Sequence, residues 1–474
     1  MMASEKLDNA PQPDLELATD GDKYINDASN DTINESSKNT ANGTSKDASK
    51  DITKDGVAKK PPVQAGGPPG APSPPPDGGL VAWLQVASGF VLFFNTWGLI
   101  SAFGVFQAYY ESGVLFQATS SNISWIGSIQ SFLLQFAGLI AGPLYDRGYL
   151  RLLLVTGSFM IVFGLMMLSL CTVYWQALLA QAFVIGIGAG LLFVPTVSLL
   201  PTYFSTHMGL AVGVASSGSS LGGVIYPIVL YRLIDQIGFP WAVRCLGFIA
   251  LATFIVPLVF MRVRVRVPKP RAIVDWSAFT DVPFATFMLA VLIIFIAQCV
   301  LLFYISFYPV NRSLTNESLG FYMTAIFNAG SVLGRILPNA LSDRIGPFNT
   351  MGPLTLVYGT TICCLLAVHN AAGMVVEGIV TGFFSGMVIA LPPVCFRMLT
   401  KNPSMIGTRM GQGFAISGLG LLLGGPSAGA ILGSNEPLNW TGIWLYGGVC
   451  GLVAGLIILA VRVMRAGFAL KVKA

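Results

Sequence analysis

The sequence predicts an all-α membrane protein with twelve transmembrane helices in two pseudo-symmetric six-helix halves. Three observations lead to this fold class. First, the 474 residues are 54% hydrophobic and only 10% charged, whereas soluble domains carry about 25% charged residues. Second, twelve apolar runs follow one another along the chain, each long enough to cross the hydrocarbon core of a bilayer. Third, motifs of the first half recur in the second half at nearly constant spacing.

Residues 1–76 differ in composition from the rest of the chain. They hold 8 of the 27 Lys and Arg residues and 12 of the 22 Asp and Glu residues. Such a polar segment cannot bury enough apolar surface to fold, which predicts a disordered tail, and the proline-rich stretch 61–76 predicts an extended spacer. No apolar segment of the signal-peptide kind opens the chain. The tail is therefore expected in the cytosol.

The apolar runs have the length and hydropathy of membrane-spanning helices. The twelve predicted helices are 80–107, 123–144, 150–172, 175–199, 207–231, 241–262, 284–308, 318–341, 350–369, 371–395, 408–433 and 438–464. They form an N-terminal half over 77–262 and a C-terminal half over 284–474, joined by a loop over 263–283.

Basic residues are distributed unequally between the two predicted membrane faces. Fifteen of them lie in the loops after the second, sixth, eighth and tenth helices and in the C-terminal tail. The positive-inside rule places these loops and both termini in the cytosol. The plasma membrane is the expected location, with a vacuolar or another internal membrane as the alternative. The basic run from Arg262 to Arg271 is interpreted as a topology anchor that contacts lipid headgroups.

An internal repeat relates the two halves. Asp146-Arg147 follows the second helix, and Asp343-Arg344 follows the eighth helix 197 residues later. Two homologous halves in parallel orientation are typical of transporters that rock around a central site. Each Asp-Arg pair can bias the equilibrium between inward- and outward-facing states through contacts at a helix end, which predicts a gating role. The alternative is that each pair only caps its own helix.

Three further stretches connect these motifs to a known family. They are Gly142-Pro143-Leu144-Tyr145-Asp146-Arg147 with its second copy from Leu341 to Gly346, Pro76-Asp77-Gly78-Gly79 with Trp83, and Tyr203-Phe204 with Ala211, Gly213, Ala215 and Gly218. The first resembles the signature of the major facilitator superfamily, and the other two resemble signatures of its monocarboxylate transporter-like family, in the fungal branch. The resemblance implies the major facilitator fold and secondary active transport of a small organic solute.

The sequence departs from that family's carboxylate carriers at positions tied to substrate and proton. Those carriers have a lysine midway along the first helix, where this chain has Ile100, and an Asp four residues before the arginine of the eighth helix, where it has Ser331. The arginine itself is present as Arg335. The residues to which the family's proton coupling is attributed are therefore only partly present.

Two charged residues, Arg335 and Glu377, lie well inside predicted spans and away from their ends, where charge is costly and usually functional. Arg335 is predicted to recognise a carboxylate or phosphate on the substrate, since its planar fork matches such groups. The alternative is a structural pairing with Asp343 or with backbone carbonyls. Glu377 is predicted to carry a coupling proton, and structural hydrogen bonding is the alternative.

Aromatic and amide side chains in helices one, five, seven and eight can stack on a ring and bond its substituents. For each of these residues taken alone, packing within the protein is the alternative to contact with the substrate. The predicted substrate-contacting set is Asn95, Trp97, Gln107, Tyr226, Tyr304, Tyr308 and Asn328.

The predicted function is alternating-access transport of a small organic solute, with a carboxylate-bearing metabolite or secondary metabolite as first choice. A neutral heterocycle such as riboflavin is the alternative substrate, and a nutrient sensor that transports nothing is the rival function. Neither an enzyme activity, nor a cofactor or metal, nor a nucleic-acid or obligate protein partner is indicated. Sequons on the predicted outer face are candidate glycosylation sites at Asn122, Asn311, Asn316 and Asn439.

Overall fold

The computed structural model describes residues 75–264, 274–402, 405–433, 437–467 and 472. All of them belong to the single contact unit formed by residues 67–474. The predicted tail before residue 75 lies outside the described residues, as do Arg266, Lys269 and Arg271 of the predicted basic anchor.

The N-terminal half contains helices on which few residues are polar, so each is apolar enough to face lipid or its neighbours. In chain order they are α1 (Leu80–Ser101), α2 (Phe103–Glu111), α3 (Ser120–Phe136), α4 (Gly138–Asp146), α5 (Leu150–Leu168), α6 (Tyr174–Ala177), the π-helix η1 (Leu178–Ile185), α7 (Gly186–Leu199), the 3-10 turn η2 (Leu200–Thr202) and α8 (Met208–Phe260).

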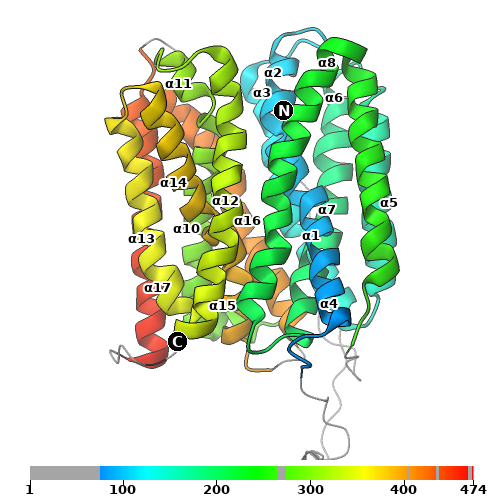
Figure 1. Cartoon of the computed structure of the whole chain (residues 1–474), viewed down its shortest axis with the longest axis vertical. Helices are drawn as coiled ribbons and strands as arrows, with labels where there is room; N and C mark the ends of the chain where they lie inside the picture. The colour runs from blue at the N-terminus through cyan, green and yellow to red at the C-terminus, as the bar shows by residue number, and fades with distance from the viewer. Residues whose placement is uncertain (1–74, 265–273, 403–404, 434–436, 468–471, 473–474) are drawn as a thin grey trace, which may run out of the picture. The chain divides into compact units, whose positions relative to one another are not determined.

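The long element α8 consists of two membrane crossings. Its helical geometry is broken at Gly238, which has φ 76° and ψ 161°, a conformation that glycine adopts at little cost. Tyr226 before the break and Thr253 after it both hydrogen-bond the side chain of Asn95. The two arms therefore run antiparallel beside α1, as the sequence predicted for 207–231 and 241–262 (Figure 1).

The C-terminal half repeats this plan. Its elements are α9 (Ser277–Thr280), α10 (Val282–Tyr304), α11 (Phe307–Asn311), α12 (Glu317–Ile345), α13 (Pro347–Cys364), the 3-10 turn η3 (Leu365–Ala367), α14 (Ala371–Ala390), α15 (Pro392–Leu399), α16 (Ile406–Leu432) and α17 (Trp440–Ala466).

The described residues contain helices for twelve membrane crossings. Ten helical segments of the described chain are long and apolar enough to cross a membrane. One of the ten is the two-armed α8, and α12 adds the remaining crossing: its 29 residues extend about 43 Å at 1.5 Å per residue. It is less apolar than the others because it carries buried polar residues such as Asn328, Arg335 and Asn339. The predicted all-α fold is confirmed.

Several predicted helices are subdivided. The predicted span 80–107 is divided between α1 and α2, and the span 123–144 between α3 and α4. The span 371–395 ends as a continuous helix at Ala390, because Pro392 and Pro393 have no N–H to continue the hydrogen-bond ladder.

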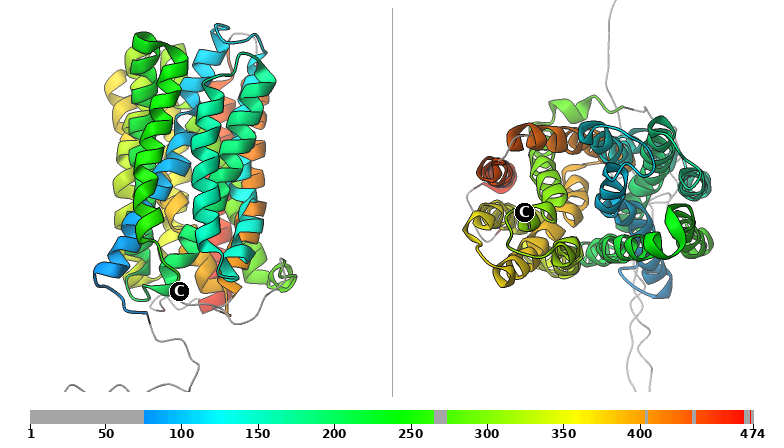
Figure 2. Two further views of the ribbon diagram at one scale, coloured as in Figure 1. Left: turned by 90° about the vertical axis from the view of Figure 1, so that its right-hand side faces the viewer. Right: turned by 90° about the horizontal axis from the view of Figure 1, so that it is seen from above.

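The two halves meet along two seams, one formed by α3 and α4 with α16, the other by α8 with α12. Figure 2 shows the two groups of helices side by side. A Cβ on Gly407 would lie 2.6 Å from Oδ1 of Asp146, and one on Gly213 would lie 2.9 Å from Cβ of Asn339. These distances are too short for real side chains. Small residues therefore allow the close approach of the halves, as is usual for helices in membranes.

Candidate functional site

A cavity lies between the two halves, at the level of the C-terminal end of α1 and the middle of α12. It encloses about 20 Å³, which is room for about one water molecule. Side chains of both halves line it: Trp97, Ile100, Ser101 and Ser131 from the N-terminal half, and Gln298, Cys299, Leu302, Phe303, Phe327, Asn328, Arg335, Ser385, Ile389 and Leu421 from the C-terminal half. Of the predicted substrate-contacting residues, Trp97, Asn328 and Arg335 are brought together here.

Arg335 is the only cation among these lining residues. Its side chain is 3% exposed, and its Nε donates to Oγ of Ser220 in the opposite half at 2.7 Å. Its Nη1 is buried and has no hydrogen-bond partner. Arg335 takes part in no ion pair with the described residues, whereas Arg409 takes part in two. The buried guanidinium therefore has a neutral hydroxyl where a carboxylate would balance its charge.

The structural partner considered for Arg335 makes other contacts. The Asp343 carboxylate accepts hydrogen bonds from the backbone N–H groups of Gly209 and Leu210 at 2.6 and 2.8 Å.

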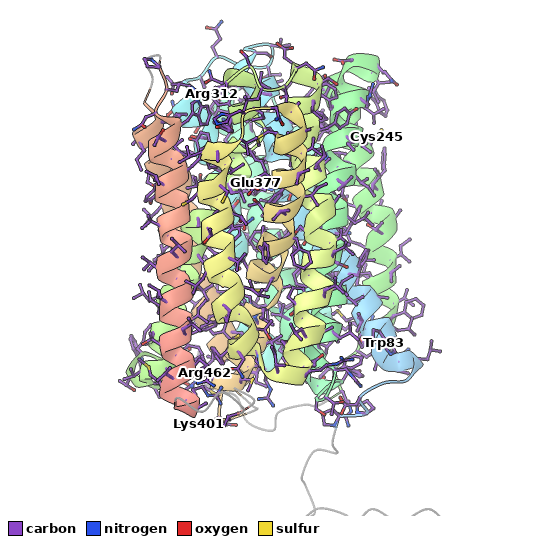
Figure 3. The ribbon with its side chains drawn as sticks, turned by 60° about the vertical axis from the view of Figure 1, so that its left-hand side comes forward. Trp83, Cys245, Arg312, Glu377, Lys401 and Arg462 are labelled. Atoms are coloured by element: carbon purple, nitrogen blue, oxygen red, sulfur yellow. The ribbon has the colours of Figure 1, made fainter. Side chains whose placement is uncertain are left out.

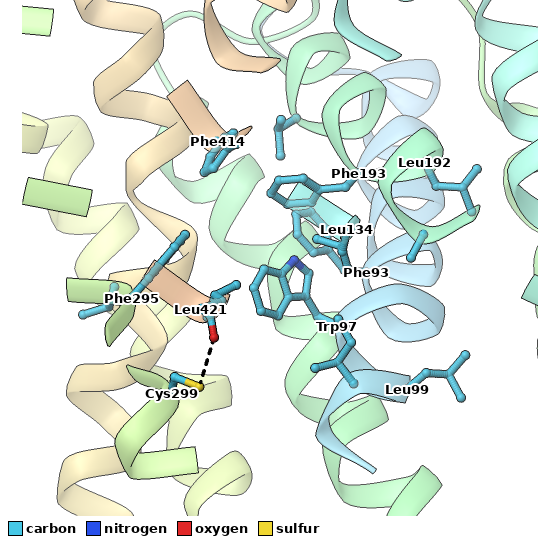
Figure 4. Close-up of a cluster of buried hydrophobic side chains, with 14 of the residues drawn as sticks. Phe93, Trp97, Leu99, Leu134, Leu192, Phe193, Phe295, Cys299, Phe414 and Leu421 are labelled. Atoms are coloured by element: carbon cyan, nitrogen blue, oxygen red, sulfur yellow. Dashed lines mark hydrogen bonds between the residues drawn. The ribbon is translucent and has the colours of Figure 1, made fainter. Parts of the chain in front are cut away.

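Trp97, which lines the cavity, belongs to an aromatic group. The indole of Trp97 contacts Phe193 with ring centroids 6.1 Å apart, and Phe193 contacts Phe414 of the opposite half at 5.0 Å. Figure 4 shows Trp97 facing Leu421, with Phe193 between Trp97 and Phe414. The Nε1 of Trp97 is buried without a partner. Trp97 thus offers a ring face and an unused donor.

Amides and hydroxyls make up the polar part of the lining. Asn328 donates to the carbonyl of Thr324 at 2.9 Å, and Oε1 of Gln298 accepts from Ser385 and Tyr358, each at 2.9 Å. Gln298 and Ser385 were not singled out in the sequence, because an isolated polar residue in an apolar run does not reveal which face it occupies.

The other predicted contact residues lie elsewhere. Asn95 and Tyr226 are fully buried inside the N-terminal half, where the Tyr226 hydroxyl donates to Oδ1 of Asn95 at 2.6 Å. Tyr304 and Tyr308 pack against Trp440, and Gln107 donates to Glu111. None of these five predicted residues lines the central cavity.

Glu377 lies on α14, between the two ends of the bundle (Figure 3). It is half-buried, and its carboxylate accepts a hydrogen bond from Thr381 at 2.9 Å. Ser385 of the cavity lining lies one further turn along the same helix. Glu377 is therefore two turns from the cavity and does not line it.

The repeated aspartates bridge the halves. Asp146, at the end of α4, accepts hydrogen bonds from N and Oγ1 of Thr408 in the first turn of α16, at 3.0 and 3.1 Å. Asp343, near the end of α12, accepts from the first turn of α8 in the same way. Each carboxylate meets the positive end of a helix dipole and satisfies N–H groups that lack an intrahelical partner. Both contacts lie at the end of the bundle that the sequence predicts to be cytosolic.

The paired arginines occupy helix ends. Arg147 is the C-terminal cap residue of α4, and Arg344 lies in the last turn of α12. Cations at these positions interact favourably with the negative end of the helix dipole.

The sequons lie at helix ends. Asn316 and Asn439 accept hydrogen bonds from the first turns of α12 and α17, and Oδ1 of Asn311 accepts from Nε1 of Trp440 at 2.7 Å. Asn122 lies in the first turn of α3. Their glycosylation remains a prediction.

Charged contacts at the start of α16 form a group that sequence reasoning missed. Arg409 of α16 pairs with Asp275 at 2.8 Å and with Asp281 at 3.3 Å. Partial burial raises the pKa of Asp275, but hydrogen bonds from Ser277 and Arg409 outweigh it and hold that pKa below its usual value. A basic residue one turn into α16 and two acidic residues just before α10 were the available signal.

A second carboxylate contact ties the start of α1 to the segment before α8. Asp77 accepts hydrogen bonds from Ser205 and Thr206, the latter at 2.8 Å from its backbone N. Partial burial acts to raise the pKa of Asp77, but these hydrogen bonds prevail and lower it. Asp77 belongs to one of the motifs on which the family resemblance rests.

Comparisons with known proteins agree with this architecture. A family model described as Major Facilitator Superfamily matches residues 86–351. The MFS-type transporter dbaD of Emericella nidulans is 58% identical over 81% of this chain and 86% of its own. The aspyridones efflux protein apdF of the same organism is 34% identical over 82% of this chain and 81% of its own. The human organic anion transporter MFSD10 is 14% identical with a TM-score of 0.61, over 80% of this chain and 98% of its own, which shows a shared fold.

These findings confirm the predicted class of function. The relatives are transporters and efflux proteins, not enzymes, and the fold has the two halves of such a transporter. The protein is a multi-pass membrane transporter of a small organic solute. With a family model that covers more than half of its length and relatives that match most of it, the chain belongs to the Major Facilitator Superfamily.

Proposed function

We propose that the protein exports an acidic, ring-containing secondary metabolite by alternating access, and that Arg335 binds the acidic group. The observation that carries this proposal is the guanidinium at the central cavity with no carboxylate beside it and an unpartnered Nη1. Burying such a charge is costly unless a counter-charge approaches it. A carboxylate on the substrate supplies that charge and fits the planar fork.

The rest of the cavity supports a substrate with a ring. Trp97, Phe303 and Phe327 supply aromatic surface, and the unpartnered Nε1 of Trp97 can donate to a carbonyl or phenolic oxygen. The name of apdF, an efflux protein for aspyridones, supports export rather than uptake. A neutral heterocycle would leave the Arg335 charge unbalanced, so we place it second.

The proposal includes the orientation of the chain in the membrane and a gate at its cytosolic end. Both termini and the loop over 263–283 face the cytosol, and the plasma membrane is the membrane that export requires. Asp146 and Asp343 close the cytosolic end by capping helices of the opposite half. Arg335 and the motif around Asp77 support a place in the monocarboxylate transporter-like branch.

Proton coupling is assigned to Glu377. It is a half-buried carboxylate on a membrane-spanning helix, two turns from the cavity. A carboxyl group in that position can bind a proton in one access state and release it in another.

The test compares an acid with its neutral amide. Stabilisation of the purified protein against heat reports binding, with 2-naphthoate and 2-naphthamide as probes. We expect the wild type to prefer the acid, and Arg335→Gln to lose this preference. Arg335→Lys should lose about 2 kcal/mol of binding free energy for the acid. A point charge cannot replace the planar fork of the guanidinium. Arg232→Gln, at an exposed arginine, is the matched control. Equal loss for both probes in Arg335→Gln would contradict the assignment.

A further inference from the structure

Four serines of α8 make two kinds of hydrogen bond. Ser216, Ser217 and Ser219 each donate to a carbonyl three residues earlier in their own helix, at 3.1, 2.7 and 2.7 Å. Ser220 is fully buried, and its Oγ accepts from Nε of Arg335 at 2.7 Å. Of these four serines, Ser220 alone is bonded to the opposite half.

The bond between Ser220 and Arg335 determines how the guanidinium is presented. Because the guanidinium is planar, holding Nε also sets the direction of the two terminal nitrogens. The cavity that Arg335 lines then contains an arginine with a defined plane and an unpartnered Nη1. Without Ser220, the long side chain would be free to take other rotamers.

The position of Ser220 makes this bond depend on the seam between α8 and α12. On one side of it Gly213 meets the backbone of Arg335 and the Cβ of Asn339. On the other side Gly223 meets the side chain of Asn328, whose Oδ1 would lie 2.8 Å from an added Cβ. Ser220 lies between these two close approaches. Any separation of the helices at this level therefore takes the Ser220 hydroxyl away from Nε.

We propose that Ser220 is a positioning residue of the substrate site, which holds Arg335 ready for an anion only while this seam is closed. The inference rests on the proposed function, in which Arg335 meets the acidic group of the substrate. It adds that the affinity for the anion depends on whether the seam between α8 and α12 is open or closed. The anion is bound most tightly while the seam between α8 and α12 is closed, and opening of this seam releases the arginine and weakens the site.

The test measures binding in four variants. The probes are 2-naphthoate and 2,4-dihydroxybenzoate, each with its primary amide. Hydrogen bonds to charged groups contribute enough that we expect Ser220→Ala to bind the acids about tenfold more weakly. Its affinity for the amides should be unchanged. Ser219→Ala, which removes a hydroxyl bonded within its own helix, should resemble the wild type. In an Arg335→Gln background, Ser220→Ala should have no further effect.

The outcomes separate the two proposals. If Arg335→Gln lowers acid affinity but Ser220→Ala does not, the positioning role is wrong and the proposed function stands. If Ser220→Ala weakens acid and amide equally, the serine serves packing alone and the inference fails. If the wild type treats acid and amide alike, the anion recognition fails, and the role of Ser220 fails with it.

Discussion

Two buried arginines of this protein have opposite surroundings. Arg409 pairs with two carboxylates, Asp275 and Asp281, so its charge is balanced within the protein. Arg335 is buried more deeply and has a serine hydroxyl as its bonded side-chain partner. A charge that is balanced internally serves structure, whereas one left unbalanced at a cavity is available to a ligand. This contrast is the reason for assigning recognition to Arg335.

Replacing Glu377 tests whether this residue carries the coupling proton. Glu377→Gln resembles the protonated side chain and keeps an acceptor for Thr381. We expect this variant to lose transport driven by a pH gradient while it still exchanges substrate across the membrane, because exchange needs no net proton movement. Proteoliposomes with an imposed gradient provide the measurement. Glu317→Gln, in the first turn of α12, is the control. Unchanged gradient-driven transport in Glu377→Gln would remove Glu377 from the mechanism.

The sequence identifies individual candidate residues better than it identifies the residues that they contact in the fold. Arg335 stands out because charge is rare in a span, and the structure places it at the cavity with Trp97 and Asn328. Asn95 and Tyr226 also lie on predicted helices, but they bond each other across 131 residues of chain. Helical periodicity shows that a residue is on a helix. It does not show which neighbouring helix that face meets, and this decides between a ligand contact and an internal bond.

At the scale of elements, a single substitution can weaken the contact between the end of α4 and the start of α16. Asp146→Asn keeps the size of the side chain but removes the charge that faces the helix dipole and the N–H of Thr408. We expect the population to shift toward the state open at this end by about 1–2 kcal/mol. Distances between spin labels on α4 and α16 measure it. Asp235→Asn, on an exposed residue, should change nothing.

The equivalent aspartate of the other half, Asp343, provides a second test of the gating role. Asp343 caps α8 as Asp146 caps α16, so Asp343→Asn should shift the same equilibrium in the same direction. Distance distributions identical to the wild type in both variants would show that the two aspartates only stabilise helix ends.

The segment before α10 is attached to α16 by Asp275 and Arg409. Because the pKa of Asp275 is lowered in the folded protein, its contribution to stability is complete above the ordinary value of 3.8 and is lost as the pH falls through the lower folded value. Asp275→Asn should therefore unfold at a lower temperature than the wild type at pH 7, with the difference shrinking below about pH 4. Equal unfolding temperatures at pH 7 would contradict this attachment.

Element boundaries follow partly from the sequence. The Asp-Arg repeat correctly indicated equivalent helix ends, and Pro392-Pro393 marks the end of α14. The attachment of Asp275 to Arg409 was not foreseen, because it joins residues 134 positions apart. Local sequence reports where a helix ends, whereas the pairing of two distant ends depends on how the helices pack.

At the scale of the whole molecule, the space between the halves is too small for the proposed substrate. The cavity holds about 20 Å³, whereas ligand sites for drug-sized molecules measure about 300–1,000 Å³. The halves must therefore separate along one end of their seams for a solute to enter. The glycine-lined seams and the two interhalf aspartates are compatible with a rocking motion around the central site.

Counterflow in proteoliposomes tests the central claim most directly. Vesicles that contain the purified protein are loaded with unlabelled 2-naphthoate and diluted into a trace of labelled 2-naphthoate. A carrier with alternating access exchanges the two, so the wild type should accumulate label above its outside concentration, and Arg335→Gln should not. A protein that binds the acid in the thermal assay but accumulates no label would be a receptor rather than a carrier, and that result would contradict the account.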